Sequence, residues 1–133
     1  LLYLLDTQTC VRFLDGSDDS VAGKIRQTPP AEISLCSLVK AELLRRARQS
    51  ASVEDNLELL ERFFQPVGSL PFDDRCAEEY GLILAQLGDQ AGDVAPADLM
   101  LAAMARAHDA VLVAPDTAPF RKIAGLRVVN WAG

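Results

Sequence analysis

The stretch Leu2-Tyr3-Leu4-Leu5-Asp6-Thr7 decides the fold of this chain. Residues 2–5 carry no charge, which is typical of a strand buried on both faces of a sheet. A second stretch, Ala110-Val111-Leu112-Val113, has the same character and is followed by another aspartate, Asp116. Both stretches indicate parallel strands with an acidic residue at or just beyond the carboxyl end. This is the edge where ligands bind in such sheets.

Between these two stretches, apolar strand-like segments alternate with segments of helical periodicity. We expect strands at 2–5, 32–36, 67–70, 110–113 and 126–130. We expect helices at about 7–14, 18–27, 37–48, 52–65, 73–87 and 96–108, with Ser37 capping the third and a loop over 88–92. The alternation predicts a three-layer α/β/α fold, in which helices cover a central parallel sheet of about five short strands. The length of 133 residues predicts a single domain over residues 1–133.

The chain is acidic, with a formal net charge of −6, and this alone argues against nucleic-acid binding. The charge is unevenly distributed, however, because one short segment holds Lys40, Arg45, Arg46 and Arg48. No apolar run approaches the roughly 18 residues of a membrane span, so we expect no membrane association.

The three cysteines, Cys10, Cys36 and Cys76, are widely spaced and include no Cys-x-x-Cys pair. This pattern argues against a zinc site and favours buried free thiols in the reducing cytoplasm. The lone histidine, His108, comes at the end of an expected helix, where interaction with the helix terminus is favoured over a role with substrate. Metal-independent ribonuclease chemistry that uses two histidines is excluded, because the chain has one histidine.

Four acidic residues lie against apolar stretches, where an isolated charge is costly. They are Asp6, Glu42, Asp98 and Asp116. A divalent metal ion is the simplest counter-charge that four carboxylates can share, and hard ions such as Mg²⁺ and Mn²⁺ prefer oxygen ligands. The sequence therefore indicates a shared metal site near the carboxyl ends of the strands.

Each acid also has a purely structural explanation. Asp6 could cap the helix that follows it, Asp98 could interact with the dipole of its helix, and Asp116 could occupy a turn. Glu42 lies inside its helix, where the competing explanation is a surface ion pair with an arginine three or four residues later. No helix-end argument accounts for Glu42, so it is the most informative of the four.

The order of these motifs resembles the PIN-domain family and, more narrowly, the VapC-type toxins of bacterial toxin–antitoxin pairs. The likeness runs from residue 2 to Trp131. It rests on the segments Leu4-Leu5-Asp6-Thr7, Lys40-Ala41-Glu42-Leu43, Leu70-Pro71-Phe72-Asp73, Asp98-Leu99-Met100-Leu101-Ala102-Ala103 and residues 111–120. The resemblance implies a metal-dependent endoribonuclease that hydrolyses RNA phosphodiester bonds and is inhibited by a cognate antitoxin. It also implies a homodimer within a larger toxin–antitoxin complex.

By motif position, the same resemblance assigns catalytic, metal-binding roles to Asp6, Glu42, Asp98 and Asp116, with Mg²⁺ or Mn²⁺ as the cofactor. It also makes three neighbouring residues candidates for substrate binding, namely Thr7, Arg45 and Arg46. Asp116 takes a place where related chains carry Asp or Asn, so contact with the metal through water is an alternative to direct ligation.

Other functions remain open at this point. A catalytically silent module of the same fold, binding RNA or protein, is the main alternative. The chain departs from the family pattern at Gln8, Arg46, Ala97 and residues 117–120, and the departures around Arg46 and Phe120 support this alternative best. A haloacid-dehalogenase-type phosphatase would need an aspartate in place of Gln8. A response-regulator receiver would need a late lysine, for which Lys122 is a poor candidate.

Overall fold

The computed structural model describes residues 1–133 and is built around a five-stranded parallel sheet of order β3-β2-β1-β4-β5. The strands are β1 (Leu2–Leu5), β2 (Ile33–Cys36), β3 (Gly68–Leu70), β4 (Ala110–Val113) and β5 (Val128–Val129). The three inner strands are β2, β1 and β4, and all the residues of β2 and β4 are buried. The expectation of strands buried on both faces is therefore confirmed for these two.

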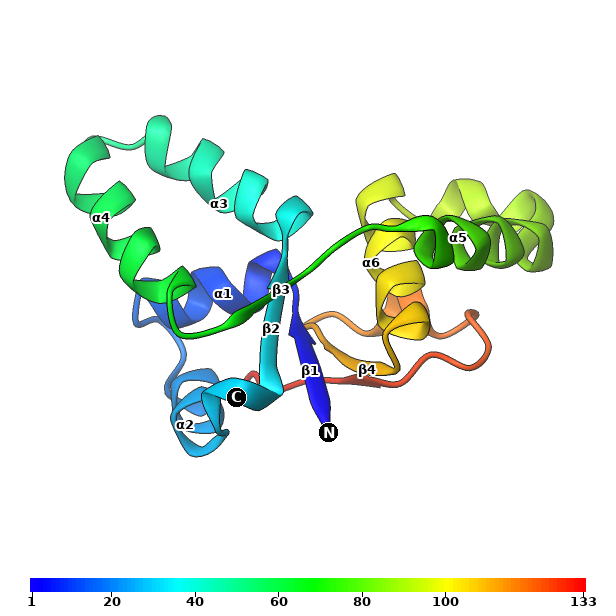
Figure 1. Cartoon of the computed structure of the whole chain (residues 1–133), viewed down its shortest axis with the longest axis horizontal. Coiled ribbons are helices and arrows are strands. Elements are labelled where there is room, and N and C mark those ends of the chain that lie inside the picture. The colour runs from blue at the N-terminus through cyan, green and yellow to red at the C-terminus, as the bar shows by residue number, and fades with distance from the viewer.

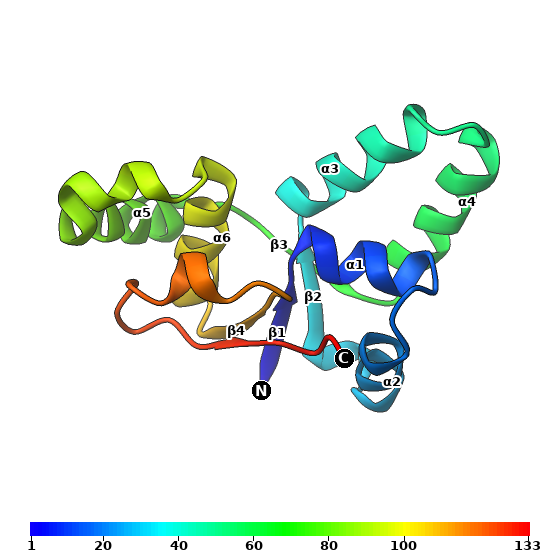
Figure 2. The ribbon, with the colours of Figure 1, turned by 180° about the vertical axis from the view of Figure 1, so that it is seen from behind.

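Six α-helices cover the sheet: α1 (Thr7–Leu14), α2 (Asp19–Gln27), α3 (Ser37–Arg48), α4 (Val53–Phe64), α5 (Asp74–Leu87) and α6 (Pro96–Ala107). Figure 1 shows α1 to α4 on one side of the sheet and α5 with α6 on the other. Figure 2 shows the same division from behind, with the carboxyl terminus beside α2. The three-layer α/β/α fold predicted from the sequence is confirmed.

Side chains that cap helices set several of the boundaries. Asp18 accepts a hydrogen bond from the Val21 backbone N–H at the start of α2, and Asp73 accepts one from the Cys76 N–H at the start of α5. Such caps satisfy backbone donors that have no partner inside the helix. None of the six helices combines the length and the hydropathy that crossing a membrane requires.

Two local expectations were wrong. Ser37 does not cap α3: it is the first helical residue, and Cys36 occupies the N-cap position without a side-chain hydrogen bond. Residues 88–93 form a short 3-10 helix rather than an irregular loop: α5 ends at Leu87, and the chain continues from Gly88 in tight turns toward Val94. Neither difference moves a strand or an acidic residue of the candidate site.

The order of the strands determines where a site can form. The chain steps from β1 to β2 and then β3 on one side, and returns to β4 and β5 on the other side of β1. At this reversal, the Asp6 N–H donates to the Val113 carbonyl at 3.0 Å, and the Thr9 hydroxyl donates to the same carbonyl at 3.2 Å. The end of β1 is thus tied to the end of β4, at the point where open parallel sheets bind ligands.

Candidate acidic site

Asp6 is the most buried acid of the four, with 9% of its surface exposed. Its Oδ1 accepts a hydrogen bond of 2.8 Å from the Thr9 backbone N–H, so Asp6 caps α1. Burial raises the pKa of this carboxyl, the hydrogen bonds from Thr9 oppose the rise, and the negative charge of Asp98 adds to it. The explanation of Asp6 as a helix cap is therefore confirmed. Capping alone does not explain why a second acid, Asp98, is close enough to affect its pKa.

Asp98 and Asp116 belong to the same electrostatic group. Asp98 is the third residue of α6 and is partly buried, while Asp116 is exposed in the segment that follows β4. Burial and then the charge of Asp116 raise the pKa of Asp98. The charge of Asp98 thus acts on Asp6, and the charge of Asp116 acts on Asp98, so three acids from distant parts of the sequence are electrostatically linked.

Asp116 also has a local role, because its Oδ1 accepts a hydrogen bond of 3.1 Å from the Ala118 N–H. This turn precedes the short 3-10 helix over Ala118–Phe120. The turn explanation for Asp116 is confirmed in the same way as the cap explanation for Asp6. In both residues, Oδ1 accepts a hydrogen bond from a backbone N–H, and the carboxylate also adds negative charge to the group of three acids.

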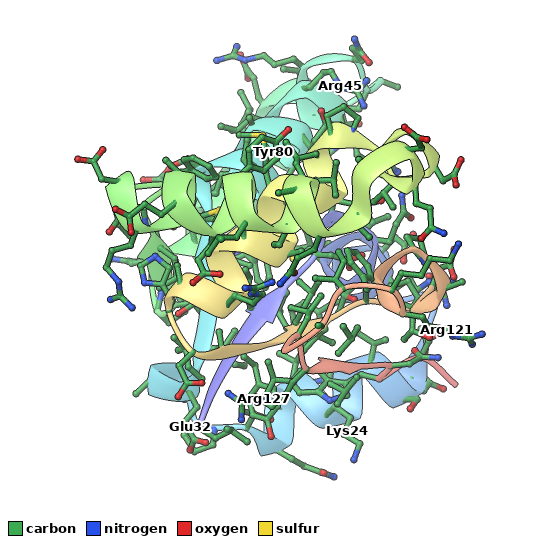
Figure 3. All side chains as sticks on the ribbon, turned by 90° about the vertical axis from the view of Figure 1, so that its right-hand side faces the viewer. Lys24, Glu32, Arg45, Tyr80, Arg121 and Arg127 are labelled. Atoms are coloured by element: carbon green, nitrogen blue, oxygen red, sulfur yellow. The ribbon has the colours of Figure 1, made fainter.

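Glu42 has a different environment. Its Oε2 lies 2.9 Å from Arg45 Nη2, and both side chains are about half exposed, 51% for Glu42 and 53% for Arg45. Arg45 also donates to the Gln49 side chain at 3.0 Å. Figure 3 shows Arg45 at the opposite end of the molecule from Lys24 and Glu32. The structure therefore places Glu42 in the surface ion pair that was its competing explanation.

The candidate substrate contacts are also partly engaged within the chain. Arg46 lines a groove between α1, α3 and α4, and its charge helps lower the pKa of Asp15 after the hydrogen bonds from Ser17. Lys40, which belongs to the same basic segment but is not one of these candidates, lies 5.1 Å from the centre of the Phe64 ring. Thr7 is the first residue of α1 and is partly buried beside Asp6.

The chemistry of these three acids fits a hard divalent cation, although their ligand atoms do not all lie within 4.8 Å of one another. Three carboxylates, Asp6, Asp98 and Asp116, supply only oxygen donors, which Mg²⁺ and Mn²⁺ prefer. The raised pKa values of Asp6 and Asp98 follow from burial and from neighbouring negative charge, and a bound cation would relieve both effects.

Sequence reasoning missed a second group of donors. Asp73, Cys76 and His108 have donor atoms within 4.8 Å of one another and form a potential metal-binding group. All three cysteines are free and buried, as expected, and His108 is the C-cap of α6. The sequence carried no signal for this group, because Cys76 and His108 are 32 residues apart and meet only through the packing of α5 on α6.

Comparison with known proteins places this arrangement in a family. The PIN domain model matches residues 3–126. The chain is 30% identical over 132 residues to the tRNA(fMet)-specific endonuclease VapC of Shigella flexneri, covering 99% of each chain. Among solved structures, the DNA-bound VapBC of Salmonella typhimurium is similar with a TM-score of 0.90 and 27% identity, covering 99% of each chain.

The VapBC2 structure of Rickettsia felis, bound to a DNA fragment from its promoter, gives a TM-score of 0.89 at 27% identity and covers 98% of this chain and 99% of the other. The chain therefore belongs to the PIN domain family. Within this family, the resemblance to VapC chains that the motif order indicated is confirmed.

Proposed function

We propose that the chain is a metal-dependent endoribonuclease toxin of the cytoplasm, with residues 1–133 forming one nuclease domain. The proposal is supported by the electrostatic interaction of Asp98 with both Asp6 and Asp116, beside the topological reversal of the sheet. The names of the relatives support RNA as the substrate, since they include endonucleases and ribonucleases. Three free buried cysteines are compatible with a reducing compartment.

Asp6, Asp98 and Asp116 would hold the cofactor, Mg²⁺ or Mn²⁺, with Glu42 as the fourth ligand once it leaves Arg45. Such an ion activates water and offsets the negative charge that develops on a phosphate. The acids themselves repel a phosphodiester, so their charge must be neutralised before RNA can approach. The cap on Oδ1 keeps Asp6 in place, because it fixes the carboxylate against the first turn of α1.

Two relatives, from Shigella flexneri and Salmonella typhimurium, are named as tRNA(fMet)-specific endonucleases. We therefore propose initiator tRNA as the first substrate to test. The exposed arginines of α3 are the candidate contacts for its phosphates, and the breaking of the Glu42–Arg45 ion pair would release Arg45 for this role.

We also propose that a cognate antitoxin inhibits the chain, since structural relatives were solved as VapBC complexes. A groove of about 260 Å³ between α1, α3 and α4 is the candidate docking surface. It is lined mainly by apolar side chains, among them Val11, Leu43, Leu59 and Leu60. The net charge of −6 favours a basic partner segment. A homodimer within a larger toxin–antitoxin complex is part of the same proposal.

The proposal is tested by incubating purified protein with initiator tRNA, an elongator tRNA and ribosomal RNA. We expect cleavage with millimolar Mg²⁺ or Mn²⁺ and none with excess chelator, with the cut sites read by sequencing the new 5′ ends. Asp6→Asn is the control, because asparagine retains the cap while removing the charge. Cleavage that survives this substitution would indicate a contaminating nuclease, and the absence of cleavage of any RNA would favour the catalytically silent module.

The role of Glu42 is tested separately by comparing Glu42→Gln with Arg45→Gln. We expect Glu42→Gln to lower the cleavage rate about tenfold or more and to raise the Mn²⁺ concentration needed for half-maximal rate. Arg45→Gln should lower that Mn²⁺ concentration, because it removes the competitor for the carboxylate. Both variants should change the unfolding free energy by no more than about 0.5 kcal/mol, since the pair is exposed. Equal metal requirements for the two variants would exclude Glu42 as a ligand.

A further inference from the structure

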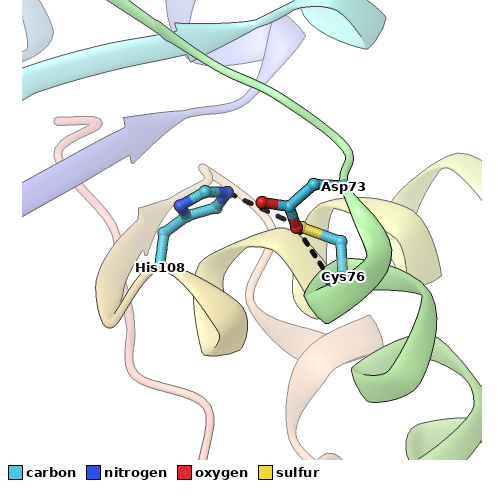
Figure 4. A group of neighbouring side chains, drawn as sticks. All are labelled: Asp73, Cys76 and His108. Carbon is cyan, nitrogen blue, oxygen red and sulfur yellow. Dashed lines mark hydrogen bonds between the residues drawn. The ribbon is translucent and has the colours of Figure 1, made fainter.

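The group formed by Asp73, Cys76 and His108 joins the start of α5 to the end of α6. Asp73 is the N-cap of α5, Cys76 lies in the first turn of the same helix, and His108 is the C-cap of α6. Cys76 is fully buried, whereas His108 is partly exposed and Asp73 is exposed. Figure 4 shows the three side chains facing one another across the gap between the two helices.

The distances within this group match those of a tetrahedral metal site. Cys76 Sγ lies 3.6 Å from His108 Nε2. With usual Zn–S and Zn–N bond lengths and a tetrahedral angle, these two ligand atoms would be about 3.6 Å apart. The donor atoms of all three residues lie within 4.8 Å of one another, so small rotations of the side chains suffice to converge on one ion.

When no ion is bound, the Cys76 thiol and the His108 imidazole share one backbone acceptor. His108 Nε2 lies 3.0 Å from the Pro71 carbonyl, and Cys76 Sγ lies 3.5 Å from the same oxygen. If Nε2 carries a proton, both the imidazole and the thiol donate to Pro71, whose carbonyl oxygen has two lone pairs. A cation bound by both Sγ and Nε2 would replace these two hydrogen bonds.

The charges also balance. Cys76 is fully buried, so a thiolate at this position needs a counter-charge. A dication with a thiolate, a carboxylate and a neutral imidazole makes a group of zero net charge, in which the thiolate is no longer an unpaired buried charge. Binding would release the thiol proton to solvent.

We propose that Asp73, Cys76 and His108 form a second metal site, selective for Zn²⁺ or a similar ion that accepts sulfur and nitrogen ligands. The site is separate from the acidic group, because Asp98 and His108 lie at opposite ends of α6, about 15 Å apart at the helical rise. Its donors differ in kind as well: thiolate and imidazole select Zn²⁺, whereas the carboxylates at the strand ends select Mg²⁺ or Mn²⁺. The bound ion clamps α5 to α6.

The test uses Co²⁺ as a spectroscopic substitute for Zn²⁺ with the whole chain. We expect one equivalent of Co²⁺ to give a thiolate-to-metal charge-transfer band in the near ultraviolet and the visible bands of a tetrahedral complex, both abolished by Zn²⁺. Cys76→Ala and His108→Gln should lose the charge-transfer band. Cys36→Ala is the matched control for removal of a buried thiol, and Asp98→Asn is the control for the acidic group; both should retain the band.

Thermal unfolding gives a second measurement. Zn²⁺ should raise the melting temperature of the wild-type chain and of Asp98→Asn, but not that of His108→Gln. His108 is partly exposed, so its replacement should leave a folded protein even if Cys76→Ala does not. A wild-type chain without a charge-transfer band, or a band that persists in His108→Gln, would overturn the proposal and leave a metal-free hydrogen-bonded contact between the helices.

Discussion

Asp98→Asn is expected to lower the rate of RNA cleavage by at least about 100-fold and to raise the melting temperature of the metal-free protein by a few degrees. The two effects have one cause. Asp98 interacts with both of the other converging acids, and its own pKa is raised by burial and by Asp116. Its charge therefore destabilises the metal-free fold and, in our proposal, is needed to hold the cofactor.

The pH dependence has a definite sign. A carboxyl whose pKa is higher in the folded than in the unfolded chain binds more protons when folded, so its ionisation costs stability above the folded pKa. This cost is relieved as the pH falls through the raised folded pKa toward the ordinary value of 3.8. The stability advantage of Asp98→Asn over wild type should therefore be largest at neutral pH and shrink on acidification within that window.

The measurement is the melting temperature of wild type and Asp98→Asn, with chelator and with millimolar Mn²⁺, at several pH values. Mn²⁺ should stabilise the wild type and have little effect on the variant, since an ion that binds only the folded state raises its stability. We compare the difference in melting temperature between the two proteins. The lowered pKa values of Asp15, Asp18 and Asp73 make both proteins less stable on acidification, and this effect cancels in the difference. Equal Mn²⁺ shifts in the two proteins would contradict a shared metal site.

Leu112→Ala is expected to reduce the unfolding free energy by about 3–5 kcal/mol. Leu112 is fully buried in β4, paired with Leu4 of β1 and Val128 of β5. Truncation leaves a cavity between the sheet and its helices, and a loss of this size is a large fraction of the stability of an ordinary domain, about 5–15 kcal/mol. Urea unfolding of the metal-free wild type and variant measures this loss of unfolding free energy.

Leu44→Ala is the matched control, because 40% of the Leu44 surface is exposed on α3. We expect it to cost less than about 1 kcal/mol, mainly through the loss of partial burial. Similar losses for the two leucines would mean that β4 is not the centre of the core.

The alternation of strands and helices could be predicted from the sequence because its signals are local. Residues 2–5 and 110–113 are apolar runs of strand length, and Pro96 marks the start of α6. The packing of α5 on α6 could not be predicted in the same way, since no local pattern specifies which helices meet. Ser37 was expected to be a cap because serine favours that position, but the chain enters α3 directly from the buried end of β2.

For the candidate site, the strand-end acids were predictable because parallel strands bring their carboxyl ends to one edge. Asp6 and Asp116 follow β1 and β4, which are neighbours in the sheet. The position of Glu42 depends on the rotamers of long side chains on one helix face, which a sequence does not specify. Its ion pair with Arg45 is the i,i+3 contact that the alternative explanation described.

The two edge strands affect how copies of the chain can associate. β3 has three residues and β5 has two, so each offers only a short row of unpaired backbone groups. Short edges hinder extension of one sheet into another and protect against aggregation through strand addition. Any symmetric association of this chain is therefore expected to use its helical faces, and a continuous sheet across two copies is not expected.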